Sequence, residues 1–281
     1  MKFYPLEYLC PTTVAETVAM WREHPEAMFV AGGQGLLYEL RLGYRRPTCL
    51  IDLSGVSELH RAHSVDDGAM LAVGSCMTLA ELAATSLEGN GGLVSKAASQ
   101  VAVGPIRTLA TAGGNFFHGS PTAEIPLAIM ACGGAAVVLD SWGETRRLTG
   151  LELRSMRPER DTSVLLLTHL EVPLQDGLDG WDFFEVGEQG TWVPVLAAAL
   201  AIPTAGGEAQ SGRIAFAVRD GSAGLIQVGR LANRAQLRDE VRAGVEEAMV
   251  QSGFSAEWVA EILVERAWTT RNTLARSGTN G

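Results

Sequence analysis

Two short glycine-rich segments hold the residues of this 281-residue chain whose types and spacing could do chemistry. The first reads Val-Ala-Gly-Gly-Gln-Gly-Leu over residues 30–36, and the second reads Thr-Ala-Gly-Gly-Asn over residues 111–115. Paired glycines let the backbone adopt positive φ and bring N–H groups close to a ligand. Several such N–H groups in a row form a concavity that binds phosphate without lysine or arginine. Two such segments meeting across a crevice would match the two phosphates of a pyrophosphate.

Neither segment fits the better-known phosphate-binding patterns. Gly33 and Gly35 begin a G-x-G-x-x-G pattern, but Tyr38 stands where the third glycine belongs, and no G-x-x-x-x-G-K-[ST] occurs. Taken singly, each segment could be an ordinary tight turn, since the chain contains 32 glycines. The residues alone therefore indicate possible anion-binding loops that are neither a Rossmann fingerprint nor a P-loop.

The surrounding pattern predicts the elements that position the two segments. Aliphatic or β-branched runs predict strands over 27–31, 48–53, 69–76, 135–140 and 164–172. Capping patterns at Thr13 and Thr78 each open a helix, and a third helix is expected over 36–42, just after the first glycine segment. The second segment lies in residues 103–121, which are expected to be extended and irregular. A helix is expected to start at Ser120-Pro121 and to reach about residue 132; residues 88–92 are expected to form a loop.

The character of the chain changes from about Trp181, and a domain boundary is expected near residue 175. Runs over 192–202, 213–218 and 225–228 suggest an antiparallel sheet. A helix is expected over 236–251, where apolar residues recur every four positions, and a second over 255–276. The first part of the chain therefore reads as α/β and the second as α+β.

Composition and charge exclude several classes of function. The chain carries 22 Lys+Arg against 32 Asp+Glu, so a basic surface for nucleic acid or an anionic membrane is not expected. The longest apolar run, about 192–203, is too short to span a bilayer, and no signal peptide is expected, so a soluble cytoplasmic protein is predicted. The four cysteines and five histidines lack metal-site spacing, so no metal site is expected. No acid–base dyad or nucleophile stands out, so no catalytic residue is predicted.

In combination, the two segments resemble the FAD-binding medium subunit of molybdenum hydroxylases, the relatives of xanthine dehydrogenase, aldehyde oxidase and carbon monoxide dehydrogenase. In that family the first segment reads A-G-G-[QT]-x-L-L, which residues 31–37 fit. The second reads I-R-x-x-[GA]-T-[IV]-G-G-N followed by S-P-x-x-[DE], as in residues 106–115 and 120–124. The resemblance covers residues 1 to about 175 well and the remainder weakly.

The resemblance implies an α+β fold of the para-cresol-methylhydroxylase FAD-binding type. Residues 1–175 would form the FAD-binding domain, made of two α/β subdomains of about 1–55 and 56–175. Residues 176–281 would form a C-terminal α+β domain of an antiparallel sheet plus helices.

The resemblance also implies that both glycine segments hold the FAD pyrophosphate through main-chain N–H groups. Glu124 takes the place of the family's usual Asp and would hydrogen-bond ribityl or ribose hydroxyls; from the residues alone it could be a first-turn acid favoured by the helix dipole. His118 would be a wall residue, and Arg107 would position the second segment or form a surface ion pair. The cofactor-binding residues so implied are Val30, Ala31, Gly32, Gly33, Gln34, Gly35, Leu36, Thr111, Ala112, Gly113, Gly114, Asn115, His118, Ser120 and Glu124.

The chain departs from the family pattern at three places. Ala112 stands where Ile or Val is usual, and Gly35 replaces a common Ser, Asp or Thr. Residues 185–189 are acidic where the family often has a tyrosine and a basic pair. These changes are expected to alter the surroundings of the flavin and its redox tuning.

The resemblance implies a flavin subunit that takes electrons from 2Fe-2S clusters on a small subunit and passes them to NAD⁺, dioxygen or another acceptor. A large subunit would carry the molybdopterin-bound molybdenum, and the family expectation is an (αβγ)2 assembly. The alternatives are a stand-alone FAD oxidoreductase of the same fold acting on a small molecule, a non-catalytic subunit with structural or no FAD, and a binder of a phosphate-sugar or nucleotide.

Overall fold

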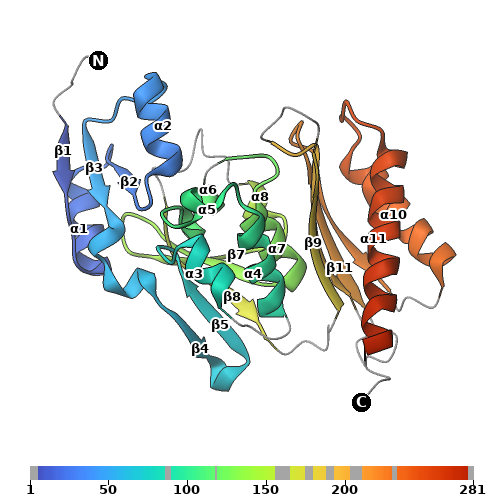
Figure 1. The fold of residues 1–281 in the computed structure, drawn as a ribbon. Helices are drawn as coiled ribbons and strands as arrows, with labels where there is room; N and C mark the ends of the chain where they lie inside the picture. The colour runs from blue at the N-terminus through green and yellow to red at the C-terminus, as the bar shows by residue number, and fades with distance from the viewer. Residues whose placement is uncertain are drawn as a thin grey trace.

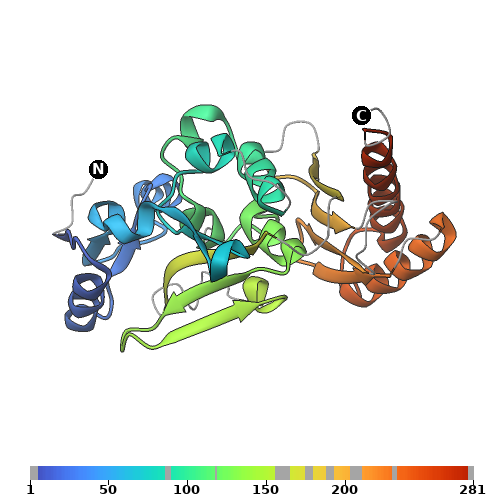
Figure 2. The same cartoon turned by 90° about the horizontal axis from the view of Figure 1, so that it is seen from below.

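Three β-sheets follow one another along the chain, with helices between and beyond them (Figure 1). The computed structural model describes residues 6–85, 90–117, 119–155, 165–174, 180–187, 193–202, 211–229 and 233–277. The first sheet lies at one end of the molecule and the C-terminal helices lie at the other, as both views show (Figures 1 and 2). No helix in the described part of the chain combines the length and the apolar character needed to cross a bilayer.

The first sheet is small and parallel. Strands β1 (Glu7–Leu9), β3 (Cys49–Asp52) and β2 (Met28–Val30) lie side by side in that order. Helices α1 (Val14–Glu23) and α2 (Gln34–Leu42) connect them, and Thr13 caps α1 by accepting a hydrogen bond from the Glu16 N–H. Trp21 of α1 is almost fully buried and packs edge-on against Phe29, with ring centroids 5.0 Å apart. This packing fixes the strand that leads into the first glycine segment.

The second sheet has five strands in the order β4-β5-β8-β6-β7, and every neighbouring pair is antiparallel. Its strands are β4 (Ala62–Val65), β5 (Met70–Gly74), β8 (Leu166–Pro173), β6 (Ala135–Leu139) and β7 (Thr145–Thr149). Between β5 and β6 the chain forms helices α3 (Leu79–Ala84), α4 (Asn90–Gln100), α5 (Gly104–Arg107), α6 (Ala112–Phe117) and α7 (Glu124–Cys132), and the short helix α8 (Glu152–Ser155) follows β7. One turn of 3-10 helix lies at each of Leu53–Gly55, Ser57–His60 and Asp66–Gly68.

The third sheet is antiparallel, in the order β12-β11-β10-β9. It comprises β9 (Gly180–Val186), β10 (Leu196–Ile202), β11 (Gly212–Val218) and β12 (Ala223–Val228), and α10 (Arg234–Ala248) and α11 (Ala256–Ser277) follow it. Helices α4 and α7 pack on one face of this sheet, and α10 and α11 lie on the other (Figure 1).

The two faces of the third sheet differ in the size of their side chains. Alternate residues of a strand point to opposite faces. In β10, Ala197, Ala199 and Ala201 join the core shared with α4 and α7, whereas Leu200 and Ile202 join the core under α10 and α11. Small side chains let the two helices approach the sheet closely. The second and third sheets therefore share one continuous hydrophobic core.

Several expectations are confirmed and three are wrong. The first glycine turn, the helix after it, the capping box at Thr78 and the antiparallel third sheet with its two long helices are present. Residues 103–121 are not irregular, because they contain α5 and α6. The helix expected from Ser120-Pro121 begins at Glu124, with Ala123 as its N-cap. Part of the expected loop 88–92 is helical, since α4 starts at Asn90, whose side chain donates to the Pro173 carbonyl.

The domain boundaries expected from the sequence, near residues 55 and 175, stay predictions. Strand β8 ends at Pro173 and β9 begins at Gly180, on either side of the predicted boundary near residue 175. The shared core means that the two parts meet across a packed interface.

Candidate cofactor-binding site

The first glycine segment opens α2 without a capping side chain. Gly33 is the N-cap residue, in the left-handed region with φ 69°, and no side chain caps the helix there. The first N–H groups of a helix have no partner within the helix. Among the described residues, the N–H groups of Gln34, Gly35 and Leu36 find no backbone or side-chain acceptor either; the first paired amide is that of Leu37, which donates to the Gly33 carbonyl. Open N–H groups and the positive end of the helix dipole make this a suitable site for an anion.

The structure brings the two glycine segments together at Gly32. A Cβ on Gly32 would lie 1.8 Å from the carbonyl oxygen of Leu109 and 3.1 Å from the Cα of Ala110. Only glycine permits this approach. Because Leu109 and Ala110 directly precede the second segment, the contact places the two segments side by side.

The second glycine segment is the start of α6, and most of its N–H groups are already used. Those of Ala112 and Gly113 donate to the carbonyls of Met77 and Ser75, at 2.9 and 2.8 Å. That of Gly114 donates to the Thr111 hydroxyl at 3.0 Å, and that of Asn115 to the Thr111 carbonyl at 2.9 Å. The open N–H groups therefore lie on the first segment, and the binding of pyrophosphate by the second stays a prediction.

Ser75 is a neighbour of the second segment that the sequence did not single out. A Cβ on Gly113 would lie 2.9 Å from both the Cβ and the carbonyl oxygen of Ser75. The Ser75 hydroxyl is buried and has no hydrogen-bond partner within the described part of the chain. Buried polar atoms are normally paired, so an orphaned hydroxyl beside a glycine cradle fits a site built for a ligand.

Asn115 ties the end of the second segment to the start of α7. Its Nδ2 donates to Glu124 Oε2 at 2.7 Å, and its Oδ1 accepts from the Ile125 N–H at 3.0 Å. The side chain thereby satisfies an N–H group of the first turn of α7, which Ala123 cannot cap. Asn115 and Glu124 are thus brought together. The Ser120 hydroxyl lies 3.5 Å from that of Thr122, and the predicted wall residue His118 lies outside the described residues.

Glu185, near the end of β9, brings a second carboxyl group to Glu124. Its Oε1 atom is buried without a hydrogen-bond partner within the described ranges. Burial, and then the negative charge of nearby Glu124, raise the pKa of Glu185 to about 7. The sequence signalled this residue only as part of an acidic stretch, and nothing local in the sequence pairs it with Glu124.

Arg107 holds the turn that precedes the second segment. Its Nη1 donates to the carbonyls of Val101 and Ala102, both at 2.8 Å. Ala102 has a positive φ of 45°, which is costly for a residue with a side chain, so these bonds help to maintain the turn. Arg107 therefore positions the chain that leads into the segment.

A separate group of possible metal ligands lies on the first sheet. A carboxylate oxygen of Glu7, an imidazole nitrogen of His24 and the thiol sulfur of Cys49 lie within 4.8 Å of one another. Burial raises the pKa of the Cys49 thiol, which favours the neutral form over the thiolate that metals bind. Glu7 already faces His24, with Oε2 3.5 Å from Nδ1. We interpret the group as part of the packing of this sheet.

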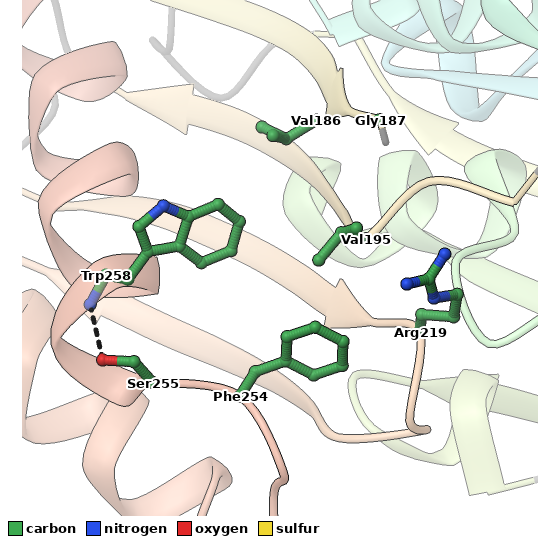
Figure 3. A pocket seen from close by; sticks show the side chains of 7 residues that line it. All are labelled: Val186, Gly187, Val195, Arg219, Phe254, Ser255 and Trp258. Atoms are coloured by element: carbon green, nitrogen blue, oxygen red, sulfur yellow. Dashed lines mark hydrogen bonds between the residues drawn. The ribbon is translucent and has the colours of Figure 1, made fainter. Parts of the chain in front are cut away.

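A pocket of about 360 Å³ lies elsewhere, between the ends of the third-sheet strands and the turn that joins α10 to α11 (Figure 3). In it, the Ser255 hydroxyl accepts a hydrogen bond from the Trp258 N–H at 3.2 Å. None of the predicted cofactor-binding residues lines this pocket. The lining residues are Val186, Gly187, Val195, Arg219, Phe254, Ser255 and Trp258.

The fold matches that of chains in two solved oxidoreductase structures. A structure of quinoline 2-oxidoreductase from Pseudomonas putida 86 matches 99% of this chain and 99% of its own chain, with a TM-score of 0.77 and 21% identity. A carbon monoxide dehydrogenase structure from Hydrogenophaga pseudoflava matches 97% of this chain and 99% of its own, with a TM-score of 0.73 and 20% identity. At these identities the likeness establishes the α+β fold.

Sequence comparison gives the family. Residues 3–175 match the family described as "FAD binding domain in molybdopterin dehydrogenase". The chain belongs to this family, which confirms the resemblance seen in its two glycine segments.

Curated relatives carry related descriptions. The chain is 30% identical over 192 residues to caffeine dehydrogenase subunit beta of Pseudomonas sp. strain CBB1, covering 67% of this chain and 64% of that subunit. It is 29% identical over 122 residues to the carbon monoxide dehydrogenase medium chain of Hydrogenophaga pseudoflava, covering 43% of this chain and 42% of that one. The matches thus span less than two thirds of these relatives.

Proposed function

We propose that this chain is the flavin subunit of a molybdenum hydroxylase, which accepts electrons from a 2Fe-2S subunit and passes them through FAD to an acceptor. The observation that carries the proposal is the uncapped N-terminus of α2. Its three open N–H groups follow Gly33, and Gly32 packs directly against the chain that enters the second glycine segment. Membership of the FAD-binding family gives this anion site its expected ligand, the FAD pyrophosphate.

The residues present fit FAD, and each has a place in the proposal. The N–H groups of Gly33, Gln34, Gly35 and Leu36 would hold phosphate oxygens, while Glu124 would accept hydrogen bonds from ribityl or ribose hydroxyls. The bound flavin would supply the redox chemistry, and the protein supplies binding, orientation and electrostatics. The other residues proposed to line the cofactor are Val30, Ala31, Gly32, Thr111, Ala112, Gly113, Gly114, Asn115, His118 and Ser120.

The two-part organisation belongs to the same proposal. Residues 1–175 would form the FAD-binding domain, in subdomains of about 1–55 and 56–175, and residues 176–281 would form the C-terminal domain. The family match over residues 3–175 and the step from β8 to β9 support this division.

The proposal requires partner subunits. A small subunit would carry the 2Fe-2S clusters and a large one the molybdopterin-bound molybdenum, in an (αβγ)2 assembly, and electrons would leave to NAD⁺, dioxygen or another acceptor. The support is that relatives are described as a subunit beta and a medium chain of dehydrogenases, which implies further chains.

Purification of the tagged chain from its native cells tests this role. We expect FAD, iron and molybdenum to co-elute with two further chains, one small and one large, and the metals to stay with the partners when the complex is dissociated. A chain that binds FAD but elutes alone, without iron or molybdenum, would instead support a stand-alone flavin oxidoreductase.

A further inference from the structure

We propose that Glu185 is a positioning residue for the flavin site: from the third sheet it shares one proton with Glu124 and so holds Asn115 and the second glycine segment in place. The inference rests on the proposed function in that the segment positioned is the one assigned to FAD.

The strand register places Glu185 on the face of the third sheet that α4 and α7 cover. On β9 the side chain of Phe183 joins the core shared with α4 and α7, whereas Phe184 joins the core under α10 and α11. Since alternate residues point to the same face, Glu185 points with Phe183. It pairs in register with Ala197, whose small side chain belongs to the same face. The carboxyl group therefore lies on the face that α4 and α7 cover, where Glu124, in the first turn of α7, is close enough to act on it.

Two carboxyl groups in this position need a proton between them. Two ionised carboxylates repel, and each can only accept hydrogen bonds, so a bond from one to the other requires that one be protonated. Glu185 Oε1 is buried and has no donor among the described residues. A shared proton would satisfy the buried atom and remove the repulsion at once.

The charged groups around Glu185 leave Glu124 as its main partner. Strand β10 carries no titratable residue. On α4, Lys96 is exposed, and on α11, Arg266 lies on the opposite face of the sheet, where it contacts the Phe184 ring and faces Asp182 at 3.8 Å. Burial raises the pKa of Asp182, and both cations lower it. Among the described residues, the charge that acts on the raised pKa of Glu185 is that of Glu124. Within the described ranges, no cation replaces the proton.

A continuous set of side-chain contacts runs from this pair to the glycine segment. Glu124 accepts from Asn115 at 2.7 Å, and Asn115 also accepts from the N–H of Ile125 and directly follows Gly113 and Gly114. If Glu185 ionises, repulsion pushes on Glu124 and, through it, on Asn115. An acid whose folded-state pKa is raised stabilises the folded state least above that pKa, so stability is lost as the pH rises from about 4.5 through about 7.

The test compares the wild type with Glu185→Gln, whose amide donates to Glu124 at every pH. FAD affinity is followed by quenching of flavin fluorescence from pH 5.5 to 8.5, and the melting temperature of the FAD-free chain is followed over the same range. If FAD binds only when the Glu185–Glu124 pair holds its proton, the FAD affinity of the wild type should fall on the order of tenfold between pH 7 and pH 8.5. The FAD affinity of the variant should stay level over the same range. Glu246→Gln on α10, an exposed glutamate paired with Arg242, serves as the control and should keep the wild-type profile.

Parallel pH profiles for the wild type and Glu185→Gln, in both affinity and melting temperature, would overturn the inference. Failure of the wild type to bind FAD at any pH would overturn the proposed function and the positioning role for FAD. The melting temperatures would then still decide whether the proton is shared, because they are measured without cofactor.

Discussion

The carbonyl oxygen of Leu109 occupies the position that a side chain on Gly32 would need. A Cβ there would lie 1.8 Å from that oxygen, well inside any permitted contact. Two segments separated by almost eighty residues of chain therefore meet through backbone atoms alone. The open N–H groups of α2 are held in place by this contact, so the anion site depends on it.

Substitution of Gly32 by alanine is predicted to separate the two segments. Overpacking of this kind costs about 1–3 kcal/mol of unfolding free energy. We expect FAD affinity to fall about tenfold or more, equivalent to about 1.4 kcal/mol, because the N–H groups move relative to the rest of the site. Denaturant unfolding and flavin titration measure the two effects.

Gly104→Ala is the matched control for this variant. A Cβ on Gly104 meets nothing within 4 Å, and its φ lies outside the left-handed range. If Gly104→Ala weakens FAD binding as much as Gly32→Ala does, the close contact is not what positions the site.

Asn115→Ala is predicted to loosen the junction between α6 and α7. The change removes the hydrogen bond to Glu124 and leaves the Ile125 N–H without its acceptor, so we expect a loss of about 1–3 kcal/mol in unfolding free energy and weaker FAD binding. Asn233→Ala, which removes the cap of α10, should cost about 1 kcal/mol and leave FAD affinity unchanged. Equal losses of affinity in both variants would show that general stability, and not the junction, sets FAD binding.

Arg213 is predicted to hold the other end of α7 against the third sheet. Its Nε donates to the carbonyl of Ala131 at 2.6 Å and its Nη2 to that of Cys132 at 2.8 Å, where a cation also complements the helix dipole. Arg213→Met should lower the unfolding free energy by about 1.5–3 kcal/mol, the range for hydrogen bonds to charged groups. Arg213→Lys keeps the charge but not the two-pronged geometry, so its melting temperature should lie between the other two. Equal stability of the methionine variant and the wild type would contradict this role.

The sequence predicted the features that depend on residues close together in the chain, such as helix caps and tight turns. Thr78 and Glu81 form a complete capping box, and Thr13 caps α1, because these bonds involve residues only three positions apart. The first glycine segment was also predictable, since Gly33 meets a local need for positive φ at the start of a helix. The order and spacing of the two segments indicated the family, which the match over residues 3–175 confirms.

The features that the sequence did not predict depend on distant contacts. Helix α6 forms where an irregular chain was expected, because the amides of Ala112 and Gly113 dock on residues 75 and 77. Glu185 meets Glu124 only because α7 packs on the third sheet, across β10 and β11, on the face to which Glu185 points. No local pattern announces such a pairing, so an acidic stretch was all that the sequence indicated.

The visible absorption spectrum of the purified chain, followed by acid release and identification of its chromophore, tests the central claim most directly. We expect flavin absorption bands and about one FAD per chain, either as isolated or after reconstitution, because the protein's part in flavin chemistry begins with stoichiometric binding. A colourless chain that takes up no FAD, with or without its partners, would contradict the account and leave the two glycine segments as turns or as a site for a different phosphate ligand.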